Sequence, residues 1–404
     1  MKIVRIIARL NVGGPSRHVV WLTSALNNGE FSSVLVAGTV PEGEESMEYF
    51  ADANGVTPIY LRSMSRELSL RDFSALWGML KILWRERPDV IHTHTAKAGT
   101  IGRMAGFIYR ILSRRKVKLI HTYHGHVFHS YYGRVLTKFF LLIERLLASF
   151  TTDRIIVISE QQRDEILKKF SVGSESQYSV VRLGLDLSAF RDDPKDRERF
   201  RREIGLTEGD FTIGFVGRLT SIKNIPLLLE SFGVAVRSME PHASRLKLVL
   251  VGDGGLRREL EREVVRRGLE DLVHFAGNRD DPGSFYAGLD AVALSSLNEG
   301  TPLSLIEAMA ANRPFISTAV GGVIDLAGDV VRDIGGVCFR QRGITVNSGD
   351  ASAMAAGLLQ IAKGSEEIDS MRIRGNEFVR AEYEKARLIK DLANLYRDCA
   401  APSS

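Results

Sequence analysis

Short apolar runs rich in Val and Ile recur along this chain, and each is followed by a stretch of helical period. This alternation is typical of βαβ units, in which each strand lies parallel to the one before. Six such runs fall in the first half, at residues 2–8, 32–38, 89–94, 118–124, 154–159 and 178–184. Six more follow at residues 211–217, 246–252, 272–277, 291–296, 314–319 and 335–340. The pattern predicts an α/β protein with two doubly wound sheets.

The seam between the two sheets is predicted near residues 187–210, which are charged and poor in β-branched side chains. A chain of 404 residues is long enough for two domains that each bury a core. We therefore expect a first domain over 1–187 and a second over 188–373. Residues 374–404 are expected to form a C-terminal helix that packs back towards the first domain.

Composition excludes several classes of protein. Apolar residues at 44% and charged residues at 25% are typical of a folded, water-soluble chain. Cys338 and Cys399 have no motif around them, so neither a disulfide framework nor a zinc site is expected, and the cytoplasm is the expected compartment. The longest apolar segment, residues 135–150, is too short and carries too many charges to span a bilayer.

The net charge is unevenly distributed. Residues 1–186 contain 25 Lys and Arg against 17 Asp and Glu, and the rest contain 29 against 32, so the formal charges are +8 and −3. Residues 97–145 alone contain ten basic side chains and one acid, Glu144. This segment is expected to attract phosphates or an anionic membrane surface. The alternative interpretation is a solvated basic face over a buried helix.

Two glutamates flank a predicted helix start. In open α/β sheets ligands bind beyond the carboxyl ends of the strands, and EGTPLSLIE, from Glu299 to Glu307, directly follows an apolar run. Thr301 suits the N-cap of a helix and Pro302 its first position, and the free N–H groups there favour a phosphate. Such a glutamate pair is often solvated, but the strand and the Gly-Thr-Pro turn favour a ligand site.

Basic residues and paired glycines follow other strands. Arg218 and Lys223 could neutralise a diphosphate leaving group, although solvated charges are the alternative. Arg279 lies in a loop that could hold a nucleobase. Gly13 and Gly14 do not match G-x-G-x-x-G, so they predict only a turn whose N–H groups can approach a ligand, or an ordinary βα turn.

Six of the nine histidines lie between residues 92 and 129. A metal site is not predicted, because no Asp or Glu occurs between Val90 and Ile143 and carboxylates commonly orient metal-bound imidazoles. No Asp-x-Asp motif occurs in the chain either. His124, in HTYHGH at the end of a predicted strand, is a candidate for hydrogen bonding a sugar or phosphate. For the other histidines a satisfied or partly exposed imidazole is the simpler interpretation.

Taken together, these residues resemble the retaining, nucleotide-sugar-dependent glycosyltransferases of family 4, which have the GT-B fold of two Rossmann-like domains facing across a cleft. The matching elements are the GG loop with His18, the TYHG histidine, VISE at Ser159, LGLD at Asp186, GRLTSIKN, LVGDG at Asp253, FAGNRDD and the two glutamates of EGTPLSLIE. The stretch HTHTAKAGTIGRMAG further resembles the branch that builds capsular, exopolysaccharide and O-antigen units on a lipid carrier. One departure is Leu183, where the family usually has Asn.

The resemblance implies a role for each motif. The second domain would bind a UDP-linked nucleotide-sugar donor. The sugar would meet Glu299 and the backbone of Gly300, Thr301, Pro302 and Leu303, the ribose would meet Glu307, and the base would meet the loop of Arg279. The diphosphate would meet Arg218 and Lys223 of this domain and Gly13 and Gly14 of the first domain. His124 would contact the donor sugar near the reaction centre. The acceptor would lie on the first domain, at His18, Lys97, Tyr123, Phe128 and Tyr131.

The activity so implied is transfer of a sugar, with retained anomeric configuration and no metal, to a hydroxyl of a glycan or a polyprenyl-diphosphate-linked acceptor in bacterial surface polysaccharide synthesis. Arg218 and Lys223 would assist departure of the nucleotide, and domain closure would exclude water. The protein would be cytoplasmic, with peripheral attachment to the inner face of the membrane. Two alternatives stay open: a nucleotide-sugar 2-epimerase of the same fold, and a non-catalytic nucleotide-sugar-binding protein. The basic segment has no nucleic-acid motif, so nucleic acid is not an expected partner.

Overall fold

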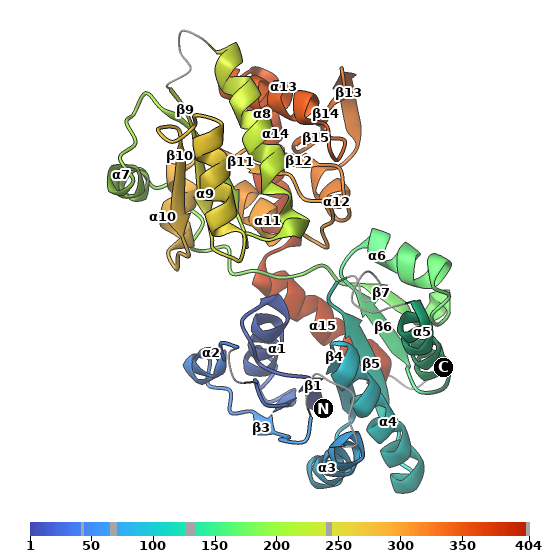
Figure 1. Cartoon of the computed structure of the whole chain (residues 1–404). Coiled ribbons are helices and arrows are strands. Elements are labelled where there is room, and N and C mark those ends of the chain that lie inside the picture. Colours follow the sequence, from blue (N-terminus) through green and yellow to red (C-terminus); the bar gives the residue numbers. More distant parts are fainter. Residues whose placement is uncertain (42–43, 65–70, 126–133, 240–244, 401–404) are drawn as a thin grey trace. The chain divides into compact units, whose positions relative to one another are not determined.

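The computed structural model describes residues 1–41, 44–64, 71–125, 134–239 and 245–400 (Figure 1). It divides the chain into two compact units. The first unit consists of Met1–Gly184 together with Lys385–Ser404, and the second of Leu185–Glu384. Each unit is built on one β-sheet with helices packed against it.

The first unit contains a seven-stranded parallel sheet in the order β3-β2-β1-β4-β5-β6-β7. Its strands are β1 (Lys2–Ile7), β2 (Ser32–Ala37), β3 (Ile59–Tyr60), β4 (Val90–His94), β5 (Lys118–Tyr123), β6 (Arg154–Val157) and β7 (Tyr178–Val180). Its helices are α1 (Gly14–Ala25), α2 (Glu48–Ala53), α3 (Arg71–Glu86), α4 (Ala96–Ser113), α5 (Arg134–Phe150), α6 (Glu160–Asp164) and α15 (Lys385–Ala400).

Both faces of this sheet are buried, which explains why its strands are almost continuously apolar. Alternate residues of a strand point to opposite faces. Val4 and Ile6 therefore pack with α3 and α4 on one face. Ile3 packs with α1 and α15 on the other face, and Ile7 with α1 and α2.

The second unit contains an eight-stranded sheet in the order β10-β9-β8-β11-β12-β15-β14-β13. Its strands are β8 (Phe211–Val216), β9 (Leu246–Val251), β10 (Val273–Gly277), β11 (Ala291–Leu294), β12 (Phe315–Thr318), β13 (Val330–Ile334), β14 (Val337–Arg340) and β15 (Ile344–Val346). Its helices are α7 (Pro194–Glu203), α8 (Ile225–Ser238), α9 (Arg257–Arg266), α10 (Pro282–Gly288), α11 (Leu303–Ala310), α12 (Val323–Ala327), α13 (Ala351–Lys363) and α14 (Glu366–Glu382).

All twelve predicted strands are present, but the last one runs in the other direction. The run at 335–340 forms β14, which is antiparallel to β13 and β15. Gly335 and Gly336 connect β13 to β14 with φ values of 59° and 86°, the left-handed backbone that a tight hairpin requires. The short strands β3, β13 and β15 were not predicted.

The C-terminal segment differs from the predicted single helix over 374–404. It forms two helices that part at residues 383–384, and only α15 belongs to the first unit. There Leu388, Leu392 and Tyr396 of α15 complete the apolar cluster on the α1 face of the sheet. The boundary between the units therefore falls at 184, with a second crossing at 384, and not at 187 and 373.

Candidate active site

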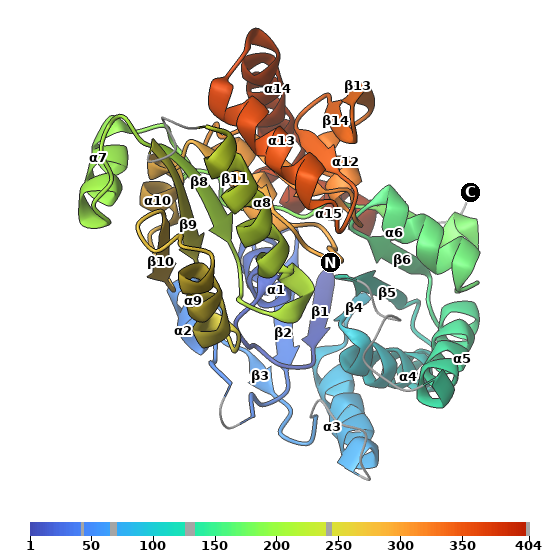
Figure 2. The same cartoon turned by 45° about the horizontal axis from the view of Figure 1, so that its top comes forward.

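In the second unit the candidate residues gather where the strand order reverses. β8 and β11 are neighbours in the sheet although two other strands separate them in sequence, and Figure 2 shows them side by side. Lys223 follows β8, and Glu299 follows β11. A switch point of this kind opens a crevice at the carboxyl ends of the strands, where α/β proteins bind ligands.

Glu299 is held by an ion pair and a hydroxyl. Lys223 Nζ donates to its Oε1 atom at 2.6 Å, and Ser296 Oγ donates to the same oxygen at 2.5 Å. The glutamate is 8% exposed, so these charge-assisted hydrogen bonds act in a partly dehydrated setting. The carboxylate is therefore fixed in one orientation at the strand end.

Helix α11 begins one residue later than predicted. Pro302, with a ψ of 106°, is the residue before the helix, and Leu303 is its first residue. Thr301 is therefore not the N-cap. The N–H groups of the first turn of α11 have no intrahelical acceptor, as at any helix start, and they follow Gly300 at the switch point. The motif predicts an anion site here, and free N–H groups at a helix start are groups that can bind an anion.

A glycine pair that we did not single out in the sequence shapes the loop before α11. Gly322 N–H donates to Gly300 O at 2.8 Å. Gly321 has a φ of 52°, and a Cβ atom there would lie 1.7 Å from Glu299 O. Only glycine therefore allows the loop after β12 to approach Glu299 so closely. The sequence signal was a glycine pair directly after a predicted strand.

Glu307 lies on the second turn of α11. Tyr286 Oη donates to its Oε2 atom at 2.9 Å, and the Tyr286 ring is fully buried. Burial and the neighbouring carboxylate raise the pKa of Tyr286 well above its usual value, so the hydroxyl stays a donor. Glu299 and Glu307 are thus both positioned by other residues of the same unit.

The other two predicted basic residues of this unit, Arg218 and Arg279, differ in their surroundings. Arg218 is exposed at the end of β8 and has no ion-pair partner among the described residues. Arg279 instead donates to Glu203 at 2.6 Å and to Asp281 at 2.8 Å. Its guanidinium therefore ties the loop after β10 to α7, and a nucleobase could meet this loop only through the backbone or other side chains.

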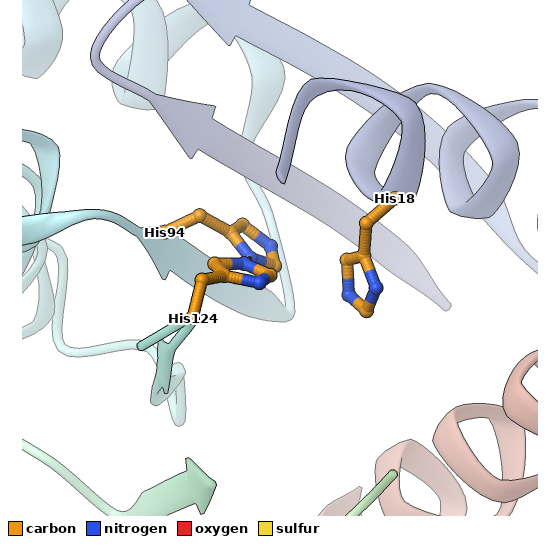
Figure 3. Close-up of side chains that lie close together, drawn as sticks. All are labelled: His18, His94 and His124. Carbon is orange, nitrogen blue, oxygen red and sulfur yellow. Dashed lines mark hydrogen bonds between the residues drawn. The ribbon is translucent and has the colours of Figure 1, made fainter. Parts of the chain in front are cut away.

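In the first unit three histidines meet at the equivalent switch point, between β1 and β4. His18 is on α1, which begins at Gly14 after the loop that follows β1, His94 ends β4, and His124 follows β5. Figure 3 shows the rings of His94 and His124 nearly stacked and the ring of His18 directed towards them. His94 Nδ1 and His124 Nε2 are 2.9 Å apart, and the His18 and His124 ring centroids are 4.8 Å apart.

These imidazoles are held in their neutral form. Burial lowers the pKa of His124 to about 4, and burial with the neighbouring rings lowers the pKa of His18 and of His94 well below the usual value. Both ring nitrogens of His18, Nε2 of His94 and Nδ1 of His124 have no hydrogen-bond partner among the described residues. Unpaired buried nitrogens are costly, so this cluster is suited to a polar ligand.

The geometry of the three rings bears on metal binding. One nitrogen from each ring lies within 4.8 Å of the others, so the fold brings together residues that could hold a metal ion although the sequence argued against one. The separation of 2.9 Å between His94 and His124 is that of a hydrogen bond, shorter than the roughly 3.3 Å between two nitrogens on tetrahedral zinc. In this arrangement His94 and His124 are hydrogen-bonded to each other through these two nitrogens.

Two predicted acceptor residues have structural roles instead. Tyr123 is 2% exposed, and its hydroxyl donates to Glu144 at 2.6 Å, as does Arg103 from α4. Lys97 donates to Asp72 on α3 at 2.6 Å. These contacts correct the expectation that Tyr123 and Lys97 meet an acceptor, because one side chain is enclosed and the other is paired. Phe128 and Tyr131 lie outside the described residues.

Two family models match this chain. The model for Glycosyltransferase Family 4 matches residues 12–189, and the model for Glycosyl transferases group 1 matches residues 210–363. The first match contains the three histidines, and the second contains Lys223 and both glutamates. The chain belongs to the family 4 glycosyltransferases. The family predicted from the motifs is thereby confirmed.

Individual proteins agree with this assignment. This glycosyltransferase is similar to UDP-Gal:alpha-D-GlcNAc-diphosphoundecaprenol alpha-1,3-galactosyltransferase of Escherichia coli, with 27% identity over 300 residues, which are 74% of each chain. It is also similar to the capsular polysaccharide biosynthesis glycosyltransferase CapM of Staphylococcus aureus, with 25% identity over 362 residues, covering 88% of this chain and 87% of that protein.

The fold of this family 4 member matches a solved structure over its whole length. The crystal structure of Anabaena Alr3699/HepE in complex with UDP has a TM-score of 0.81 and 18% identity, and the match covers 98% of this chain and 100% of that one. The prediction of a GT-B protein with two Rossmann-like domains is confirmed. The chain is a glycosyltransferase whose relatives act in polysaccharide and lipid-linked sugar synthesis.

Proposed function

We propose that this glycosyltransferase moves a sugar from a UDP-sugar to a hydroxyl of a lipid-linked glycan acceptor, with retention and without a metal. The observation that carries the proposal is the Lys223–Glu299 pair at the β8/β11 switch point, directly before the start of α11. An oriented carboxylate for sugar hydroxyls and a cationic, N–H-rich end for phosphate lie together there. This is the combination that a nucleotide-sugar donor requires.

The second unit is assigned the donor. The diphosphate would meet Lys223, the exposed guanidinium of Arg218 and the first turn of α11, and the sugar hydroxyls would meet Glu299 and Gly300. Glu307, positioned by Tyr286, is assigned the ribose. UDP is favoured over other nucleotides because the E. coli relative is named for UDP-Gal and the Anabaena structure contains UDP.

The chemistry follows from charge development on the leaving group. As the glycosidic bond breaks, negative charge accumulates on the diphosphate, and Arg218 and Lys223 would stabilise it. Two cations at the diphosphate can supply the assistance that a metal ion supplies elsewhere, so no metal is proposed. The acceptor hydroxyl would attack from the face that the nucleotide leaves, which retains the anomeric configuration without an enzymic nucleophile.

The first unit is assigned the acceptor. The unpaired nitrogens of the His18, His94 and His124 cluster offer neutral acceptors and donors to a hydroxyl group. The named acceptor of the E. coli relative is a sugar on diphosphoundecaprenol, and we propose the same class here. A lipid-linked acceptor would bring the protein to the inner face of the membrane.

The test is a donor screen on the purified full chain. Each common nucleotide sugar is incubated with a membrane lipid extract in EDTA, and release of the nucleotide and labelling of lipid are followed. Labelled lipid from one UDP-sugar is the expected result, and a glycosidic product of retained configuration by NMR would support retention. Epimerisation of the donor, donor binding without lipid labelling, or activity that appears only with a divalent metal would contradict the proposal.

Two variants make the screen specific. Lys223→Met should abolish transfer because it removes a cation at the diphosphate and the hydrogen bond that Lys223 donates to Glu299. Lys247→Met is the matched control, since Lys247 lies on β9 of the same unit and donates to a backbone oxygen, Asp271 O, at 3.0 Å. Equal loss in both variants would mean that the effect is structural.

A further inference from the structure

A buried arginine lies next to the histidine cluster of the first unit. Arg5 interrupts the apolar strand β1 and is fully buried, and no carboxylate within the described ranges forms an ion pair with it. In the register of the sheet, Arg5 is the partner of His92 on β4. Burial of a cation without a counterion is costly, so packing alone does not account for this residue.

The hydrogen bonds of Arg5 go to two hydroxyl groups. Nη1 donates to Ser33 Oγ at 2.9 Å, and Ser33 Oγ donates in turn to Leu26 O at 2.6 Å. Nη2 donates to Tyr396 Oη at 3.3 Å. Tyr396 belongs to α15, near the other end of the chain, and is fully buried. The first strand and the C-terminal helix are therefore joined through this hydroxyl.

The same hydroxyl contacts the ring of His92. Tyr396 Oη is 2.6 Å from His92 Nδ1, and the other ring nitrogen, Nε2, is 2.7 Å from Thr122 Oγ1 on β5. A guanidinium can only donate, so the Tyr396 oxygen accepts from Arg5 and donates its own proton to His92 Nδ1. His92 then carries its proton on Nε2 and donates it to Thr122. With this order both ring nitrogens are paired, and the tautomer of His92 is fixed.

His92 in turn borders the histidine cluster. The rings of His92 and His94 have centroids 4.1 Å apart, and His94 Nδ1 is 2.9 Å from His124 Nε2 (Figure 3). Both nitrogens of His92 are used, whereas His94 Nε2 and His124 Nδ1 lack a hydrogen-bond partner in the part of the chain that the structure describes. His92 is therefore placed to support the cluster and not to bind a ligand itself.

The charge states fit this order of donors and acceptors. Burial is the main cause of the lowered pKa of His92, His94 and His18. The positive charge of Arg5 lowers the pKa of each ring further. Burial raises the pKa of Tyr396, so its hydroxyl keeps the proton that it donates. Near neutral pH the imidazoles are uncharged and the phenol is protonated.

We propose that Tyr396 is a positioning residue for the acceptor site: its hydroxyl fixes the ring of His92, which fixes the ring of His94 and the His94–His124 pair. Without the hydroxyl, His92 Nδ1 has no donor, so the ring can turn or change tautomer and no longer supports His94. The inference rests on the acceptor role proposed above for the histidine cluster. The geometry of the rings can be measured without any substrate.

The first measurement follows the imidazoles directly. The full chain is labelled with ¹⁵N-histidine, and long-range ¹H–¹⁵N correlation spectra report which nitrogen of each ring carries the proton. The signals of His92 are identified by their loss in His92→Gln, and those of His94 and His124 in the same way. The wild type should show His92 in one form, protonated on Nε2. In Tyr396→Phe the His92 signals should shift or divide between two tautomers, and those of His94 and His124 should shift with them.

The second measurement connects the rings to transfer. Transfer is followed at varied amounts of membrane lipid extract and of the UDP-sugar that the donor screen identifies. Tyr396→Phe should raise the half-saturating amount of extract roughly two- to tenfold, which corresponds to the loss of one hydrogen bond. The half-saturating concentration of UDP-sugar should not change, because the donor is assigned to the second unit. A merely structural defect would reduce the amount of active protein and leave both values unchanged.

The matched control is Tyr178→Phe. Tyr178 begins β7 of the same unit, and its hydroxyl donates to Val172 O at 2.6 Å, so this variant also loses one hydroxyl hydrogen bond. Tyr178 packs in the apolar cluster that contains Ala148 of α5. The variant should have the histidine signals and the half-saturating amount of extract of the wild type.

The two measurements fail in different ways. Wild-type His92 protonated on Nδ1, or His94 and His124 signals that are unchanged in Tyr396→Phe, would overturn the positioning role even if the donor screen finds no transfer. A half-saturating amount of extract that is the same in Tyr396→Phe and the wild type, or that rises equally in Tyr178→Phe, would overturn the link to the acceptor. Absence of transfer by the wild type with shifted histidine signals in Tyr396→Phe would contradict the proposed function and leave the ring positioning supported.

Discussion

Mild acidification is expected to destabilise the first unit. Five buried imidazoles have a pKa lowered from the usual value, chiefly because burial disfavours the charged ring: His18, His92, His94, His121 and His124. In the unfolded chain each ring takes up a proton near pH 6.5. Below that pH the unfolded state binds more protons than the folded state, so stability is lost as the pH falls.

His124 sets the scale of the effect. With a folded pKa of about 4 and an unfolded value near 6.5, linkage gives a loss of about 2 kcal/mol between pH 7 and pH 5 from this ring alone. The other four rings act with the same sign, so the total loss is larger. Domains are typically stable by about 5–15 kcal/mol, and a change of this size is readily measured.

Tryptophan fluorescence isolates the first unit, because Trp21, Trp77 and Trp84 all lie in it and the second unit has none. Urea titrations at pH 7, 6 and 5 should show a midpoint that falls with pH. His124→Gln should make the free energy of unfolding less dependent on pH by about 2 kcal/mol over this range. His274→Gln, in the second unit, should leave the dependence unchanged.

An unfolding free energy that is the same at pH 7 and pH 5 would refute the reasoning, since it would mean that the folded chain accommodates charged imidazoles. A His124→Gln variant with the full pH dependence of the wild type would refute the assignment to this ring. Restricting the measurement to pH 5 and above keeps most carboxylates ionised, so that their titration does not obscure the result.

Three further predictions concern single contacts. Gly321→Ala should lower transferase activity, because the added Cβ would displace the backbone of Glu299. The control Gly209→Ala should not, because no atom lies within 4 Å of a Cβ added there. Steady-state kinetics would test this prediction, and equal activity losses in the two variants would contradict it. Glu144→Leu should destabilise the first unit by about 3–5 kcal/mol, because it leaves Arg103 charged and without its carboxylate partner in the core. Urea titration would measure the loss. An unchanged urea midpoint would mean that the Arg103–Glu144 pair does not stabilise the unit. Removal of divalent metals with EDTA should leave the transfer rate unchanged, and restoration of a lost rate by Zn²⁺ would point instead to the histidine cluster.

Much of the fold could be predicted because its signals are local. A strand buried on both faces must be apolar along its length, and a crossover helix must repeat its apolar residues at helical spacing. These requirements located all twelve of the predicted strands within a few residues. The reversal of β14 escaped prediction, because its direction depends on a two-residue glycine turn and not on the apolar pattern.

The sequence by itself determined which chemical groups follow which strands. It therefore placed Lys223, Glu299 and His124 after the carboxyl ends of strands. Only the tertiary structure decided which of these groups meet. Lys223 and Glu299 are 76 residues apart, and strand order alone brings them within a hydrogen bond. His18 joins His94 and His124 by the same means, whereas Tyr123 is turned into the core. The physical reason is that apolar periodicity specifies elements, while contacts between distant residues depend on how those elements are ordered in the sheet.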